Sequence, residues 1–100
     1  MINLDSYGKT SSEITFQIAQ RLHDIRRRRK ISQQKLSELS GVSLGSVKRF
    51  ERTGEISLKS LALLAGALHL EQHLEALFQD VPPESIEEII RENRTRSIRS

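Results

Sequence analysis

Residues 33–52 read QQKLSELSGVSLGSVKRFER. Five apolar residues recur in this stretch at spacings typical of two short helices that face one core: Leu36, Leu39, Val42, Val47 and Phe50. Gly41 separates the two helices, and glycine adopts the positive φ of a tight turn without steric cost. Ser37 is small enough to let two crossed helices approach closely. The stretch therefore predicts two helices, over residues 33–39 and 44–52, that cross at a glycine turn.

A longer helix is expected before this stretch, from Glu13 to Lys30, with Ser12 as its N-cap. Its apolar residues recur at spacings of four, four and three, which places them on one face: Ile14, Ile18, Leu22 and Ile25. Serine also stands at the expected N-caps of the next two helices, as Ser32 and Ser43. All three helix starts are therefore indicated by a hydroxyl side chain.

Two more helices are expected after the stretch, over residues 58–69 and 71–78. Ser57 is expected to cap the first, whose inner face is formed by Leu58, Leu61, Leu64, Ala65 and Leu68. Pro82 and Pro83 end the second. A last short helix is indicated by Ile86, Ile89 and Ile90. No segment alternates apolar and polar residues with period two, so no sheet is predicted.

These elements predict an all-α protein with one five-helix domain at residues 12–80. Residues 1–11 are polar and without periodicity, which predicts a flexible N-terminal segment. Residues 81–92 are expected to form a C-terminal extension, and residues 93–100 a disordered basic tail.

Positive charge gathers in one third of the chain. Residues 21–52 hold ten Lys or Arg against three acidic residues, a net charge of +7, whereas residues 53–92 hold two against eight, a net charge of −6. Such clustering favours a polyanionic partner for the basic third, although charged residues also serve simply to keep a small domain in solution.

Several functional classes find no support in the sequence. The chain has no cysteine, and its three histidines lack partners at a metal-ligand spacing, so neither a metal nor a cofactor is predicted. No nucleophile, base and orienting group occur together, so an enzyme is not expected. The longest apolar run, residues 61–68, is too short to cross a membrane, and no leader is recognisable, so we expect a cytoplasmic protein.

Three short stretches resemble the Cro and C1-type repressors, also called the XRE family: ISQQKLSELSGVS at residues 31–43, SVKRFER at 46–52 and SLKSL at 57–61. The resemblance extends over about residues 18–78. It implies a lambda-repressor-like domain whose helix-turn-helix occupies residues 33–52 and whose second helix reads double-stranded DNA. The chain departs from the family at Ser37, where alanine is usual, and at Glu55, where relatives often place Lys or Arg.

The resemblance implies a set of DNA-contacting residues: Gln33, Ser43, Leu44, Gly45, Ser46, Lys48, Arg49 and Arg52. Arg49 is the best candidate to read a base, because its planar fork can donate two hydrogen bonds to guanine. A solvated or phosphate-bound Arg49 remains the alternative. Gln33 is expected to touch the DNA backbone and brace the reading helix, and Arg26 is expected to pair with Glu51.

The family also implies a homodimer that reads two half-sites of a palindromic operator and represses transcription. Apolar residues after the fourth helix are the candidate dimer interface, Leu74, Leu77 and Phe78, unless they only complete the monomer core. The run FERTGEISL at residues 50–58 further resembles small regulators paired with Hip-type toxin kinases. This leaves a second hypothesis, an antitoxin or adaptor that binds such a kinase through its acidic half.

Overall fold

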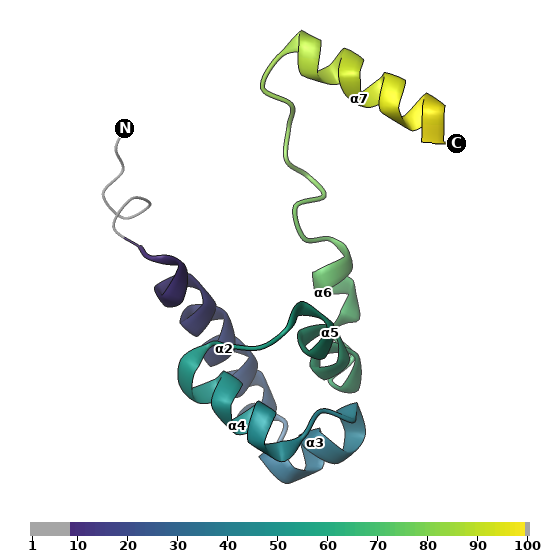
Figure 1. Ribbon diagram of the computed structural model, residues 1–100. Helices are drawn as coiled ribbons and strands as arrows, with labels where there is room; N and C mark the ends of the chain where they lie inside the picture. Colours follow the sequence, from purple (N-terminus) through teal and green to yellow (C-terminus); the bar gives the residue numbers. More distant parts are fainter. Residues whose placement is uncertain (1–8, 100) are drawn as a thin grey trace.

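The computed structural model describes residues 9–99, with side chains up to Asn93 (Figure 1). Within these residues the chain forms helices and no strand. The helices are α2 (Ser11–Arg28), α3 (Gln33–Ser40), α4 (Leu44–Thr53), α5 (Leu58–Ala67), α6 (Glu71–Glu75) and α7 (Ile86–Arg99). The predicted all-α class is confirmed, and its five-helix domain corresponds to α2–α6.

Hydroxyl side chains begin the first four helices. At α2 the N-cap is Thr10 rather than the expected Ser12: Thr10 Oγ1 accepts from the Glu13 amide, and the Glu13 carboxylate accepts from the Thr10 amide. The other three caps are confirmed, since the next three helices begin after Ser32, Ser43 and Ser57, each accepting from the amide three residues on. The sequence reading missed Thr10 because several hydroxyl residues compete there.

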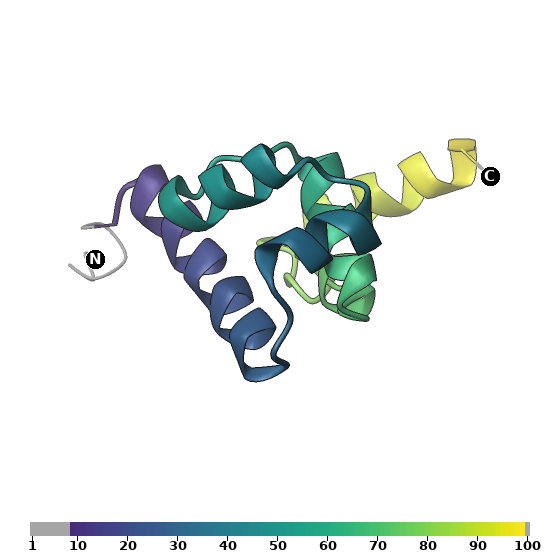
Figure 2. The same cartoon turned by 90° about the horizontal axis from the view of Figure 1, so that it is seen from below.

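The core lies where α2, α3, α4 and α5 meet. Helix α4 packs on both α2 and α3, and α3 packs on α5 (Figures 1 and 2). The core is formed by Ala19, Leu22, Leu36, Val42, Val47, Phe50, Leu64 and Leu68. Gly41 ends α3 with a φ of +79°, as the predicted turn requires.

Four leucine and isoleucine residues predicted to face inward lie at the surface: Ile14, Ile18, Leu39 and Leu58. In α2 the buried positions are Ala19, Leu22 and Arg26, a stripe rotated from the predicted one. Apolar spacing locates a helix face, but only the direction from which α4 packs decides which side of α2 is covered. Two of these residues, Ile18 and Leu58, line a shallow hollow that also includes Phe50 and Gly54.

Gly54 fixes the end of α4 against the start of α2. Its φ is +84°, and a Cβ at this position would lie 2.6 Å from the backbone nitrogen of Phe16. Its amide donates to Phe50 O at 2.7 Å. The glycine is therefore required twice, by its backbone conformation and by the close approach of two chain segments.

The C-terminal part departs from the predicted tail. Helix α7 runs from Ile86 to Arg99, whereas a short helix followed by a disordered segment from Asn93 was expected. It makes no contact with another helix among the described residues and stands apart, joined by an extended segment containing Pro82 and Pro83 (Figure 1). No described helix combines the length and apolar character needed to cross a bilayer.

Candidate nucleic-acid interface

Helix α4 has one buried face and one exposed face. Val47, Phe50 and Glu51 are buried against the other helices. The opposite face carries most residues of the predicted DNA-binding set. Exposed there are Ser43, Gly45, Ser46, Lys48, Arg49 and Arg52, with Leu44 half-buried. The helix therefore presents one continuous set of side chains to solvent while it is held from behind.

The buried face is held by a bidentate ion pair between α2 and α4. Arg26 Nε donates to Glu51 Oε2 at 2.7 Å, and Arg26 Nη2 donates to Glu51 Oε1 at 2.9 Å. Arg26 Nη1 also donates to the carbonyl of Ile31, which lies in the connection between α2 and α3. The structure thus brings together the two residues for which the sequence predicted a pair. Two parallel bonds fix the angle of the guanidinium as well as its distance.

The Glu51 carboxylate contacts two further side chains. Gln33 Nε2 at the start of α3 donates to Glu51 Oε1 at 2.9 Å, and His23 Nδ1 lies 2.7 Å from the same oxygen. The side-chain Nε2 of Gln20 donates to the backbone carbonyl of Glu51 at 3.0 Å. Glu51 therefore joins α2, α3 and α4 at one point. No pattern in the sequence indicated the His23 and Gln20 contacts, because they depend on the angle at which α2 and α4 cross.

Burial alone would raise the pKa of Glu51, because it disfavours the charged form. The hydrogen bonds from Arg26, His23 and Gln33, together with the charge of Arg26, outweigh burial and hold the pKa of Glu51 below its ordinary value. The carboxylate is therefore ionised at neutral pH, and the pair with Arg26 is intact there. The orientation of α4 depends on this charge state.

The start of α4 is open on its outer side. Ser43 Oγ donates to Ser46 Oγ at 2.8 Å and accepts from the Ser46 amide at 3.1 Å, so this hydroxyl serves the cap. Gly45 is exposed, and a Cβ there would meet nothing within 4 Å. Packing inside the protein therefore gives no reason for a glycine at this position.

Arg49 lies on the outer face and has a partner that the sequence reading did not identify. Its Nη2 donates to Glu55 Oε1 at 2.6 Å, and the two side chains are 62% and 63% exposed. The sequence marked Glu55 only as a departure from the family pattern. The spacing of six residues across a helix end gave no indication that these groups meet.

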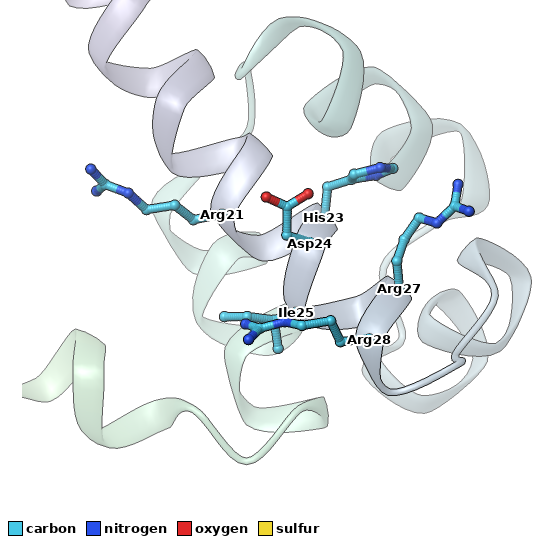
Figure 3. Close-up of a pocket in the computed structure, with 6 residues that line it drawn as sticks. All are labelled: Arg21, His23, Asp24, Ile25, Arg27 and Arg28. Carbon is cyan, nitrogen blue, oxygen red and sulfur yellow. The ribbon is translucent and has the colours of Figure 1, made fainter.

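The basic run at the end of α2 is divided among different tasks. Arg26 is buried in the pair with Glu51, and the Arg29 guanidinium donates to the carbonyl of Leu68. Arg27 and Arg28 are exposed and, with Arg21, line a shallow hollow beside α2. Figure 3 shows Arg21 and Arg27 pointing to opposite sides of the helix. The hollow therefore lacks the convergent polar groups of a small-ligand site.

The predicted dimer residues lie in α6 and in the turn after it, and α6 is not in contact with α4. Leu74 in α6 is half-buried, whereas Leu77 and Phe78 are exposed in the turn that follows. Phe78 is 79% exposed and has a φ of +65°. The structure thus leaves an apolar ridge uncovered after α6.

Two helices cross at a glycine turn, and the second of them is held on its inner face by the Glu51 network while its outer face exposes Lys48, Arg49 and Arg52. This arrangement defines a helix-turn-helix DNA-binding domain. Comparison with protein families agrees, because residues 22–71 match the family described as Helix-turn-helix, HTH_3. The match covers half of the chain, so the chain belongs to this family, and the resemblance to Cro and C1-type regulators is confirmed. The family is one of DNA-binding domains and not of enzymes. A search of curated proteins found no match.

Proposed function

We propose that this protein binds a palindromic DNA operator as a homodimer and represses transcription of its own operon. The single observation that carries the proposal is the division of α4 into a face fixed by Glu51 and a face free for contact. A reading helix needs a fixed orientation, because hydrogen bonds to base edges depend on angle as well as distance. The buried network supplies that orientation.

The outer residues of α4 have distinct roles in this proposal. Arg49 reads guanine, Leu44 contacts a thymine methyl group, and Lys48 binds a phosphate. The remaining contacts come from Ser43, Gly45, Ser46 and Arg52 on α4, and from Gln33 at the start of α3. Gln33 also braces α4, as its hydrogen bond to Glu51 supports.

A second copy is proposed because one reading helix covers only half of a useful site. Dimers of this type place two reading helices about 34 Å apart, one turn of the duplex. The ridge of Leu74, Leu77 and Phe78 is the proposed contact between copies, since exposed apolar side chains gain most from being covered.

The test is selection of duplexes from a random DNA pool by the purified chain, followed by titration of the selected site. We expect a consensus with two-fold symmetry, a Kd in the nanomolar range, and binding that weakens steeply with salt. Arg49→Ala should cost about 1–3 kcal/mol of binding free energy and relax one base position. Equal binding by Arg49→Ala would contradict the role of Arg49, and a consensus without symmetry would contradict the dimer.

A protein-interaction module is the second candidate, favoured by the uncovered apolar ridge and the acidic residues around it. In this role residues 53–92 would bind a Hip-type toxin kinase, and DNA binding would be secondary. A gel-shift assay with the DNA upstream of the gene separates the two candidates. Absence of a shift at low salt, together with a complex formed with the kinase, would favour the second.

A further inference from the structure

The turn after α4 places a carboxylate beside the reading arginine. Glu55 Oε1 accepts from Arg49 Nη2 at 2.6 Å, and both side chains are largely exposed. Exposed ion pairs contribute little to folding, because water solvates both charges well when they are apart. Stability therefore does not account for an acidic residue on an otherwise basic face.

The backbone that carries Glu55 is held firmly. Thr53 Oγ1 donates to the carbonyl of Arg49 at 2.7 Å and accepts from the Glu55 amide at 3.1 Å. Gly54, between them, is buried against the backbone of Phe16. The base of the Glu55 side chain is thus fixed relative to Arg49, whereas a residue in an ordinary surface loop would move independently.

A carboxylate in this position changes what the arginine can do. A guanidinium holds five N–H donors in one plane, so a bond from Nη2 to Glu55 limits the orientations of that plane and leaves other donors free. It also offsets the charge of Arg49, which lowers its attraction to phosphates. Lys48 is exposed beside it and has no ion-pair partner among residues 9–93, so its charge remains fully available.

We propose that Glu55 is a positioning residue for DNA recognition, one that orients the Arg49 guanidinium toward a guanine and keeps it from binding phosphate. This inference rests on the proposed function, in which Arg49 reads a base. It assigns base discrimination to the Arg49–Glu55 pair together and non-specific attraction to neighbours such as Lys48. The alternative is that Glu55 only repels DNA and lowers affinity for every sequence alike.

The experiment measures base preference rather than affinity alone. Five proteins are compared on the duplex selected by the parent chain and on duplexes altered at each position: parent, Glu55→Ala, Arg49→Ala, the double variant Arg49→Ala/Glu55→Ala, and Asp24→Ala. Asp24 is an exposed acidic residue of α2, so its replacement controls for the change in net charge. Thermal unfolding followed by circular dichroism establishes that each variant is folded.

We expect Glu55→Ala to lose about tenfold in discrimination at the one position that Arg49→Ala also relaxes. Its binding to unrelated DNA should strengthen, because one negative charge has left the interface. Asp24→Ala should keep the full base preference of the parent. In the double variant Arg49→Ala/Glu55→Ala, discrimination should fall no further than in Arg49→Ala.

Each of the other possible results contradicts a particular part of the proposal. Full base preference in Glu55→Ala, with Arg49→Ala relaxed at one position, overturns the positioning role and leaves the proposed function standing. Unchanged preference in Arg49→Ala overturns the role of Arg49 and, with it, that of Glu55. A parent chain that selects no consensus overturns sequence-specific binding altogether.

Discussion

Two arginine–glutamate pairs lie on opposite sides of α4, and their shortest N–O distances are nearly the same, although the inner pair has two hydrogen bonds and the outer pair one. The shortest N–O distance is 2.7 Å between Arg26 and Glu51 and 2.6 Å between Arg49 and Glu55. Their surroundings differ, since the first pair is 8% and 4% exposed and the second 62% and 63%. Water can replace the partner in the exposed pair but not in the buried one. The two pairs are therefore suited to different tasks, the inner one to holding α4 and, in the proposed function, the outer one to recognition.

The largest expected effect comes from breaking the inner pair. Glu51→Ala leaves the Arg26 guanidinium buried without its counter-charge, which should lower the free energy of unfolding by about 3–5 kcal/mol. Glu55→Ala is the matched control on the outer face and should change it by less than about 1 kcal/mol. Urea unfolding at neutral pH measures both. Similar losses in the two variants would show that burial does not distinguish the pairs.

The next largest effect on the free energy of unfolding is expected at Gly54, which lies between Glu51 and Glu55 in the chain. Gly54→Ala places a Cβ against the Phe16 backbone and requires a left-handed residue with a side chain, so it should cost about 2–4 kcal/mol of unfolding free energy. Gly41→Ala is its control, because Gly41 shares the positive φ but has open space around it. It should cost about 1–2 kcal/mol, the backbone strain alone. Equal costs would mean that α2 and α4 can separate without penalty.

Acid should remove the stability that the charge of Glu51 contributes. The pKa of Glu51 is lower in the folded protein than its ordinary value of 4.5, so its charge stabilises the fold above that pH. This contribution is lost as the pH falls from 4.5 through the lower folded pKa. The difference in unfolding free energy between the parent and Glu51→Gln should thus narrow below pH 4.5. Urea unfolding from neutral pH down to about pH 3 tests this, and a constant difference would contradict it.

The smallest expected change in the free energy of unfolding is at Gly45 on the outer face of α4, and it is an increase rather than a loss. Gly45→Ala should raise the free energy of unfolding by about 0.5–1 kcal/mol, because alanine favours the helix and its Cβ meets no neighbour. DNA binding should weaken, since the added methyl group would stand between α4 and the duplex. Gly66→Ala in α5 is the control, with equally open space around it. It should stabilise the fold similarly and leave DNA binding unchanged.

Sequence patterns predicted the inner face of α4 better than the outer one. Val47 and Phe50 follow from helical spacing, and Arg26 with Glu51 follows from the family resemblance. The contacts of His23 and Gln20 with Glu51 depend on how α2 crosses α4, which no spacing encodes. The pairing of Arg49 with Glu55 depends on the left-handed turn at Gly54, which brings a residue beyond the helix back toward it.

The leucine and isoleucine residues that were predicted to be buried but lie at the surface show that apolar spacing also predicts the core incompletely. Leu36 and Leu39 are equally apolar and three residues apart, yet only Leu36 is buried. Helix α3 contacts α4 and α5, and Leu39 lies on a side of the helix that neither of them buries. Apolar patterning predicts that a helix has an inner face, whereas the packing of neighbouring helices decides how wide that face is.

Three buried side chains, Val47, Phe50 and Glu51, anchor α4 to the body of the domain. Between Ser43 and Arg49, only Val47 has a buried side chain, and the other positions are exposed or half-buried. In the proposed function, the exposed positions Gly45, Ser46, Lys48 and Arg49 could therefore be varied together to select new DNA sites, while the buried anchors and the Ser43 cap are kept. Because the buried anchors and the exposed positions are different residues, the exposed ones can also change during evolution without loss of the fold.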